Sequence, residues 1–226
     1  MKGKFSRRLR ALSEYGINLV VLSIFTGLFA GTVVTLYNIL TAIAEEKSAQ
    51  LYMLVAENPV FVPLLFIGLF AGALVIGTAT RFIPMIRGSG VPQIEGAARG
   101  LLRFRWYVVM CSMFAASLAC VFMGLPAGSE GPSLQIGGCA GDGAAAITRR
   151  SFMVRRLQIA AGSSAGLAAA FNAPVTGLVF AMEEAFRSFS AQVFTCSAVS
   201  VLISLTVRKL LFEPFVRYGV RPLLAA

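Results

Sequence analysis

Charged side chains are unevenly spaced along this chain, and long apolar stretches separate them. Five stretches contain no Asp, Glu, Lys or Arg: residues 15–44, 58–80, 106–129, 157–182 and 188–207. A helix that crosses the hydrocarbon core of a bilayer needs roughly 20 apolar residues. The pattern therefore predicts an all-α membrane protein with several spans.

The segments between the apolar stretches predict how the spans are placed. Residues 1–14 are basic, so the positive-inside rule puts this segment in the cytoplasm. Residues 15–212 are expected to be the transmembrane part, with a first helix at 15–44 followed by an acidic loop outside. Residues 213–226 are expected to form a tail. On this count of spans the C-terminal arginines lie outside, against the positive-inside rule.

The composition of the chain excludes several classes of function. The chain is 57% hydrophobic, and its net charge of +10 comes from arginines that cluster between the apolar stretches. Such placement indicates membrane topology rather than nucleic-acid binding. The absence of histidine excludes imidazole catalysis and histidine-ligated metals, and the four cysteines lack metal-ligand spacing. We expect no enzyme activity, no metal and no cofactor.

One carboxylate stands apart from all other charges. Glu130 is the only charged residue between Trp106 and Gly141, and glycines flank it in the run GSEGPSLQIGG at 128–138. A glycine followed by proline often begins a helix. The N-terminus of a helix attracts anions through its free N–H groups and its dipole. An ionisable group at bilayer depth is a functional-site hypothesis by default, so we expect Glu130 to open a broken or re-entrant helix.

A second glycine-rich run, GSGVPQIEG at 88–96, has the same form. Two glycines surround Ser89, and a proline begins a helix-capable segment. The run predicts another helix N-terminus approached by a flexible turn. The alternative is a surface loop in which Ser89 only caps its helix.

Small residues predict close helix packing in two places. Residues 160–166 read AAGSSAG, and Gly27 and Gly31 are four residues apart in the first span. Asn172 and Pro174 are expected to break the helix that holds the small-residue run.

An acid pair follows this break. Glu183 and Glu184 end a short apolar segment, and Arg187 lies three to four residues further on. A salt bridge from one of these acids to Arg187 is therefore an alternative to a functional role.

Taken together, four blocks resemble the CLC family of chloride channels and chloride/proton antiporters. They are GSGVP with IEG at 88–96, the run at 128–138, the segment 162–174 and the MEE at 182–184. Their order and spacing match over nearly the whole chain. The resemblance implies chloride and protons as the transported ions, within a lipid bilayer.

The first two blocks imply an anion-binding site. In the family, a serine hydroxyl and backbone amides of the first block bind chloride, which corresponds here to Ser89 with Gly90 and Val91. Gly131 of the second block is expected at the same site.

The family's acids imply gating and proton transfer. Its gating glutamate corresponds to Glu130; that side chain competes with chloride and swings away when it is protonated. The inner glutamate of the family's proton-coupled members corresponds to Glu184, which favours exchange over simple conduction.

Some residues depart from the family pattern. Ser129 replaces the usual basic residue before the gating glutamate, and Gln93 stands where an acid is common. Neither change removes a chloride ligand. Fluoride-exporting relatives typically lack the serine of the first block, so Ser89 favours chloride.

The length of the chain sets further expectations. Family members contain two inverted repeats, and the match covers only the first, so the expected fold is the first inverted repeat of the CLC type with broken helices. Transport then needs a second repeat from another polypeptide or from a second copy in a homo-oligomer. The alternative is a truncated or vestigial membrane subunit that does not transport alone. We expect a multi-pass protein of the bacterial inner membrane.

Overall fold

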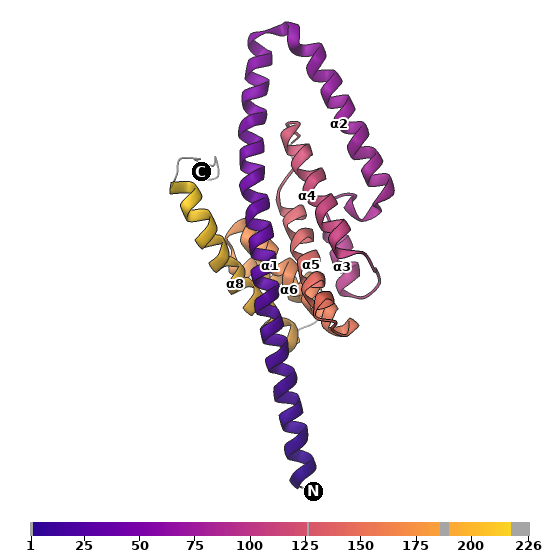
Figure 1. The fold of residues 1–226 in the computed structure, drawn as a ribbon, viewed down its shortest axis with the longest axis vertical. Coiled ribbons are helices and arrows are strands. Elements are labelled where there is room, and N and C mark those ends of the chain that lie inside the picture. Colours follow the sequence, from indigo (N-terminus) through magenta and orange to yellow (C-terminus); the bar gives the residue numbers. More distant parts are fainter. Residues whose placement is uncertain (1, 126, 186–189, 218–226) are drawn as a thin grey trace.

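The computed structural model describes the backbone of residues 2–125, 127–185 and 190–217, and the side chains of residues 16–125, 127–183 and 190–211. This part of the chain is helical and contains no strand, which confirms the predicted all-α class (Figure 1). The elements are α1 (Lys2–Glu57), η1 (Pro59–Phe61), α2 (Val62–Phe82), η2 (Pro84–Ile86), α3 (Val91–Ala98), α4 (Trp106–Phe122), α5 (Glu130–Ile147), α6 (Phe152–Phe171), α7 (Pro174–Phe180), η3 (Ala181–Ala185) and α8 (Ala191–Arg217).

The first helix is longer than predicted. α1 has 56 residues, which corresponds to about 84 Å at 1.5 Å per residue. The predicted acidic loop after residue 44 is wrong, because the chain stays helical to Glu57. Residues 45–57 contain neither glycine nor proline, and charged residues alone do not end a helix. The helix stops just before Pro59, where the chain turns into α2.

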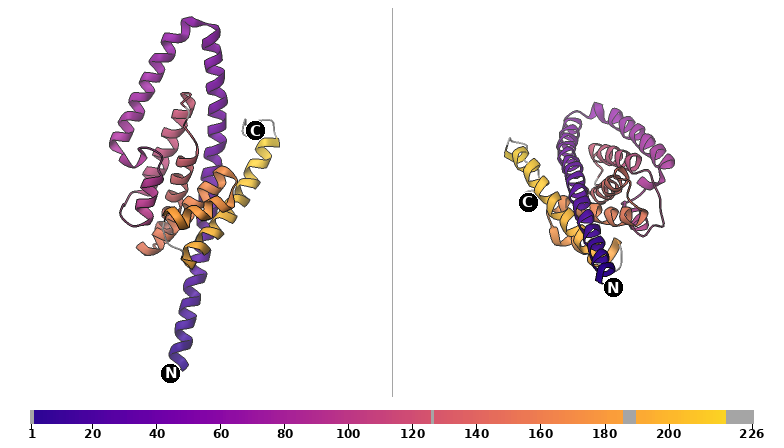
Figure 2. Two further views of the ribbon diagram at one scale, coloured as in Figure 1. Left: turned by 180° about the vertical axis from the view of Figure 1, so that it is seen from behind. Right: turned by 60° about the horizontal axis from the view of Figure 1, so that its bottom comes forward.

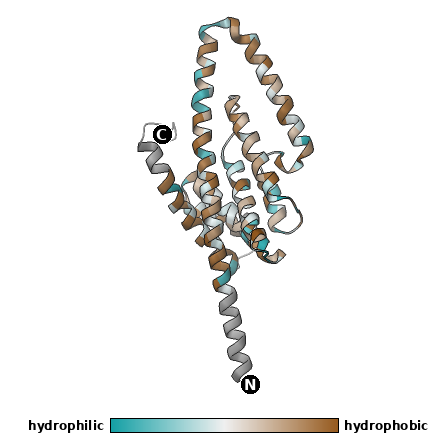
Figure 3. Cartoon of the chain, in the orientation of Figure 1, coloured by the Kyte–Doolittle hydropathy of each residue, from teal (hydrophilic) through white to brown (hydrophobic). Residues whose placement is uncertain are grey.

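The second helix stands apart from the rest of the molecule. α2 diverges from α1 below their common turn (Figures 1 and 2), and none of its residues is buried. It is hydrophobic along most of its length (Figure 3). Such a surface suits lipid or another apolar partner rather than water.

The centre of the molecule is the pair α5 and α6, which α1, α4 and α8 surround. These two helices pack backbone to backbone. A Cβ added to Gly137 would overlap the carbonyl oxygen of Gly162, and a Cβ added to Gly162 would overlap that of Gly137. The close packing predicted for residues 160–166 is therefore confirmed.

The first and last helices also approach closely. A Cβ on Gly27 would lie 2.6 Å from the carbonyl oxygen of Ser200, and one on Gly31 would lie 2.8 Å from the Cα of Ser204. The Ser200 hydroxyl donates to the carbonyl of Ser23 at 2.8 Å. The close contact predicted for the two glycines is confirmed, and α8 is the helix that they contact.

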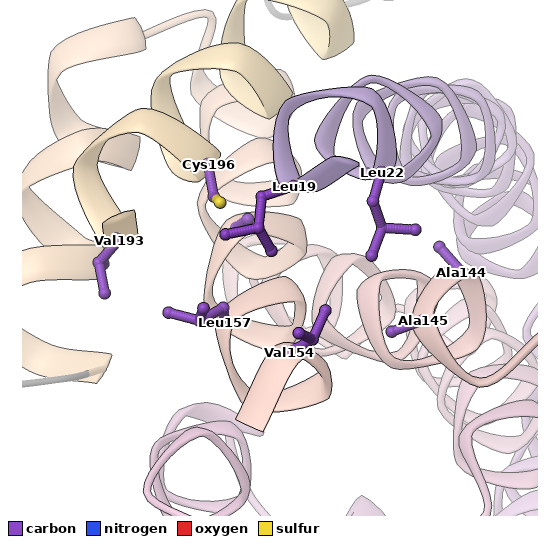
Figure 4. Packing of buried hydrophobic residues seen from close by; sticks show 10 residues of the cluster. Leu19, Leu22, Ala144, Ala145, Val154, Leu157, Val193 and Cys196 are labelled. Atoms are coloured by element: carbon purple, nitrogen blue, oxygen red, sulfur yellow. The ribbon is translucent and has the colours of Figure 1, made fainter. Parts of the chain in front are cut away.

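A hydrophobic cluster joins α1, α5, α6 and α8 (Figure 4). Leu19 and Leu22 of α1 meet Val154 and Leu157 of α6, with Cys196 of α8 beside them. Side chains at positions 154, 157 and 161 lie on one face of α6, as helical spacing requires. This cluster fixes the corner at which α5 ends and α6 begins.

Within the described residues, three helices are long and apolar enough to cross a membrane: Gly16–Glu57, Pro59–Phe82 and Ala191–Leu211. The other two predicted stretches contain shorter apolar helices, Trp106–Phe122 and Pro174–Glu183. α6 has the length of a span, but its Ala, Gly and Ser residues lower its hydropathy, and it is buried in protein. The stretch 157–182 is thus a buried helix, α6, followed by the predicted break and the short helix α7, and it does not form one continuous span.

The predicted break after α6 is confirmed. Asn172 ends α6 in the left-handed conformation (φ 55°), and Pro174 begins α7. α7 runs into the π-helical turn η3, which lies against α3, α6 and α8.

Candidate functional site

The segment between α2 and α3 is shaped by two glycines. Gly88 (φ 75°) and Gly90 (φ 82°) adopt the left-handed conformation, which glycine reaches without steric cost. Gly90 is the N-cap of α3, and Pro92 lies in the first turn. The predicted short helix is therefore confirmed. Ser89 precedes the N-cap, and α3 has no side-chain cap, so the alternative in which Ser89 only caps its helix finds no support.

Two glutamine side chains hydrogen-bond the segment between α2 and α3 to α3 and α5. Gln93 Nε2 donates to the carbonyl of Arg87 at 2.6 Å, and Gln135 Nε2 of α5 donates to the carbonyl of Met85 at 2.7 Å. Gln135 is fully buried, and a Cβ on Gly90 would press against it. A glutamine in an apolar helix is the only sequence signal for this contact, and it does not indicate the partner.

The start of α5 meets the same segment. α5 begins at Glu130, with Gly131 and Pro132 in its first turn. A Cβ on Gly131 would overlap the carbonyl oxygen of Ser89. The glycine is therefore required for contact between the two segments that the sequence singled out separately.

A cavity of about 460 Å³ opens where these segments meet. Ser89, Glu130 and Gly131 line it, together with residues of α2 and α4 that include Thr80 and Ser117. Among the described residues of this lining, Glu130 is the only charged one. Gly90 is buried and Val91 is half-buried, and neither belongs to the cavity wall; Val91 packs with Ile94 and other core residues of α3. The structure thus brings Ser89, Glu130 and Gly131 together and places Gly90 and Val91 just behind them.

Both Glu130 and Ser89 are exposed, because the cavity is open on the side that no described element covers. Glu130 makes no ion pair with any described residue. Its carboxylate therefore stands at the cavity without a fixed partner in this part of the chain.

The structure adds one hydroxyl that the sequence analysis missed. Ser117 lines the cavity, and its Oγ lies 2.6 Å from the hydroxyl of Tyr37, which is buried on α1. Ser117 is buried in α4, where two serines among apolar residues gave little signal. This hydrogen bond links the cavity wall to the long first helix.

The proton-path candidate is only partly described. The backbone of Glu184 lies in η3, but its side chain and Arg187 fall outside the described residues, so the proposed salt bridge between them is untested. Glu183 beside it is exposed. Phe180, just before η3, packs against the core residues of α3. The backbone that carries Glu184 is thus fixed near the helix that follows Ser89.

The sequence and the fold of this chain are similar to those of known proteins. Residues 71–224 fit the family model described as voltage gated chloride channel. The H(+)/Cl(-) exchange transporter ClcA of Vibrio cholerae is 32% identical over 201 residues, covering 87% of this chain and 42% of the relative. The chain therefore spans less than half the length of the relatives that it matches.

Solved structures agree. A slow cyanobacterial Cl−/H+ antiporter superposes with a TM-score of 0.74 at 29% identity, covering 85% of this chain and 46% of the other. A eukaryotic CLC transporter shares the fold, with a TM-score of 0.70 at 22% identity, 87% of this chain and 38% of the other. On this evidence the chain is a helical membrane protein that belongs to the voltage-gated chloride channel (CLC) family.

Proposed function

We propose that this chain forms one half of a chloride/proton exchange pathway, with chloride bound where α3 and α5 begin. The observation that carries the proposal is the contact between Gly131 and the carbonyl of Ser89, which joins two helix N-termini at one cavity. The relatives that support exchange are named as H(+)/Cl(-) exchange transporters.

The cavity has the chemistry of an anion site. Free N–H groups and the positive end of the helix dipole favour an anion at the start of each helix. Ser89 adds a hydroxyl that can donate a hydrogen bond, while Gly90, Val91 and Gly131 place backbone amides close by. Helix N-termini and hydroxyl donors replace the hydration shell of a small anion, as in other channel sites.

Glu130 acts as the gate in this proposal. A carboxylate and a chloride ion need the same surroundings, so the ionised side chain competes with chloride for the cavity. Protonation neutralises Glu130 and removes the competitor. Because each proton taken up frees a place for an anion, movement of the two ions becomes coupled.

Glu184 supplies the second step of the proton path. The assignment rests on its place in the acid pair at the end of the apolar run, as in the family's proton-coupled members. Its backbone in η3 lies against α3, which begins at the anion site. A carboxylate there can pass protons between the inner side and Glu130.

The pathway needs a second half. The exposed side of the cavity and the bare surface of α2 are where a complementary repeat would pack. That repeat comes from another polypeptide or from a second copy of this chain. The competing function is a membrane subunit that keeps the helical framework but does not transport alone.

The test is flux from liposomes that contain the purified full chain, alone and together with the second half of a CLC relative. We expect chloride efflux with opposite proton movement in at least one of these preparations. Glu130→Gln should keep chloride flux and lose proton movement. Absence of flux in both preparations would favour the non-transporting subunit.

A further inference from the structure

A second cavity, of about 420 Å³, lies at the other end of α5. Its lining comes from the end of α3, the segment 102–104, Asp142 of α5, and residues between Arg150 and Ile159. Asp142 follows Glu130 by twelve residues on one helix, so the two cavities are about 18 Å apart along its axis. This basic cavity, defined by Arg103, Arg150 and Arg155, is separate from the anion site.

The basic cavity carries an excess of positive charge. Arg155 donates to both carboxylate oxygens of Asp142, from Nε and Nη2, each at 2.7 Å. Asp142 is 3% exposed, so this ion pair is fixed, and it occupies the only acid among the described residues of the lining. Arg103 and Arg150 remain as two positive charges that no acid of the lining balances.

Helix capping does not account for Arg150. The last carbonyls of α5 are already bonded: Thr148 N and Oγ1 donate to Ala144, Arg149 N donates to Ala146, and Arg150 N donates to Ala145. The turn that makes these bonds holds Arg149 at φ 51°, a conformation that residues other than glycine rarely adopt. The side chain of Arg150 is therefore available to line the cavity.

Arg103 is held in place by an aromatic ring. Its guanidinium lies 4.8 Å from the ring centre of Phe152. Phe152 and Leu102 are exposed beside it, at 43% and 41%, so an apolar rim adjoins the positive charges. The hydrophobic cluster of Figure 4 holds the opposite face of the same corner through Val154 and Leu157, which gives the cavity a rigid base.

We propose that the basic cavity binds a phosphate ester. Arginine binds phosphate oxygens through a planar fork of donors, and a guanidinium beside exposed apolar side chains suits the boundary between bilayer and water. Basic pockets between membrane helices bind phospholipid headgroups in this way. The same guanidinium groups can donate hydrogen bonds to the phosphodiester of an anionic lipid or to a soluble phosphate monoester.

The test is native mass spectrometry of the full chain in neutral detergent. The ligands are phosphatidylglycerol, phosphatidylcholine with the same acyl chains, and glycerol 1-phosphate. The variant is Arg103→Gln with Arg150→Gln. The control is Arg81→Gln with Arg105→Gln, which removes the same charge from exposed arginines outside the cavity.

We expect phosphatidylglycerol to bind more tightly than phosphatidylcholine, and the cavity variant to lose about tenfold or more of that affinity, which is 1.4 kcal/mol. The control should stay within about twofold of wild type. Competition by glycerol 1-phosphate would show that the soluble ester is also accepted, and its absence would assign the site to lipid. Phosphatidylcholine is the comparison because its choline neutralises the charge of its phosphodiester. Equal losses in the two variants, or no binding of phosphatidylglycerol or glycerol 1-phosphate above phosphatidylcholine, would overturn the proposal.

Discussion

At the scale of single residues, the candidate site depends on a glycine. The backbone of Gly131 touches the carbonyl of Ser89, and that contact leaves no room for a side chain. It sets the distance between the hydroxyl of Ser89 and the carboxylate of Glu130. The sequence indicated each residue separately, through glycines beside a lone acid and beside a serine. The contact itself joins residues 42 positions apart (131 − 89), and no local pattern reveals such a pairing.

Gly131→Ala tests this contact. The added methyl would push Ser89 away from the start of α5, so we expect chloride flux to fall about tenfold or more, a loss of 1.4 kcal/mol in binding or in the barrier. Gly16→Ala on α1 is the matched control, because nothing lies within 4 Å of its added Cβ and it lies outside the proposed site and the surface of α2. Equal flux in the two variants would show that the Ser89 segment is not positioned by α5.

Two neighbouring acids test the proton path. Glu184→Gln should uncouple proton movement from chloride flux, because an amide cannot carry a proton through the path. Glu183→Gln should keep the coupling, since Glu183 is exposed and has no role in the proposal. Proton uptake driven by a chloride gradient measures both. The assignment to Glu184 fails if the two variants behave alike.

At the scale of elements, helix packing was the most predictable feature. Small residues at 160–166 and at Gly27 and Gly31 indicated close approach, and the structure confirms it. Helix starts at the two glycine-rich runs and the break at Asn172 were also predicted from local chemistry. The end of α1 could not be predicted in this way, because the acids after residue 44 suggest a loop although no residue there breaks a helix.

Gly162→Val tests the central packing. The side chain would meet the backbone of α5 at Gly137 and Gly141, so α5 and α6 would have to separate. Overpacking of this kind costs about 1–3 kcal/mol, and we expect a lower thermal unfolding temperature in detergent. Gly68→Val on α2, where an added Cβ meets nothing within 4 Å, should unfold close to wild type. Similar unfolding of the two variants would argue against the packing described.

At the scale of the whole molecule, the described helices enclose the α5/α6 pair but leave one side of the cavity at Ser89 open. α5 and α6 are surrounded, but the cavity at Ser89 is open and α2 is bare. α1 begins at one end of the molecule, and α8 ends toward the other (Figures 1 and 2). An odd number of crossings, as expected of a single inverted repeat, places the two ends of a chain on opposite sides of the membrane. Hydropathy could predict membrane insertion, but it could not show that α5 and α6 would be wrapped by α1 and α8.

The source of the second half is open to direct measurement. If copies of this chain complete each other, flux should appear only in liposomes that hold at least two copies, and site-directed cysteine labelling should find both orientations in the bilayer. If another polypeptide completes the site, one orientation should dominate, and flux should require the added partner. Flux from vesicles that hold a single copy of this chain and no partner would contradict both arrangements.

The central claim is that Glu130 and chloride compete for the site at Ser89. The most direct test is chloride binding to the purified full chain, with its second half if flux requires one, by isothermal titration calorimetry across a range of pH. Wild type should bind chloride more tightly as the pH falls, because the protonated side chain no longer competes. Glu130→Gln should bind more tightly than wild type at neutral pH and show little pH dependence. The same pH dependence in both proteins, or weaker binding by Glu130→Gln, would contradict the account.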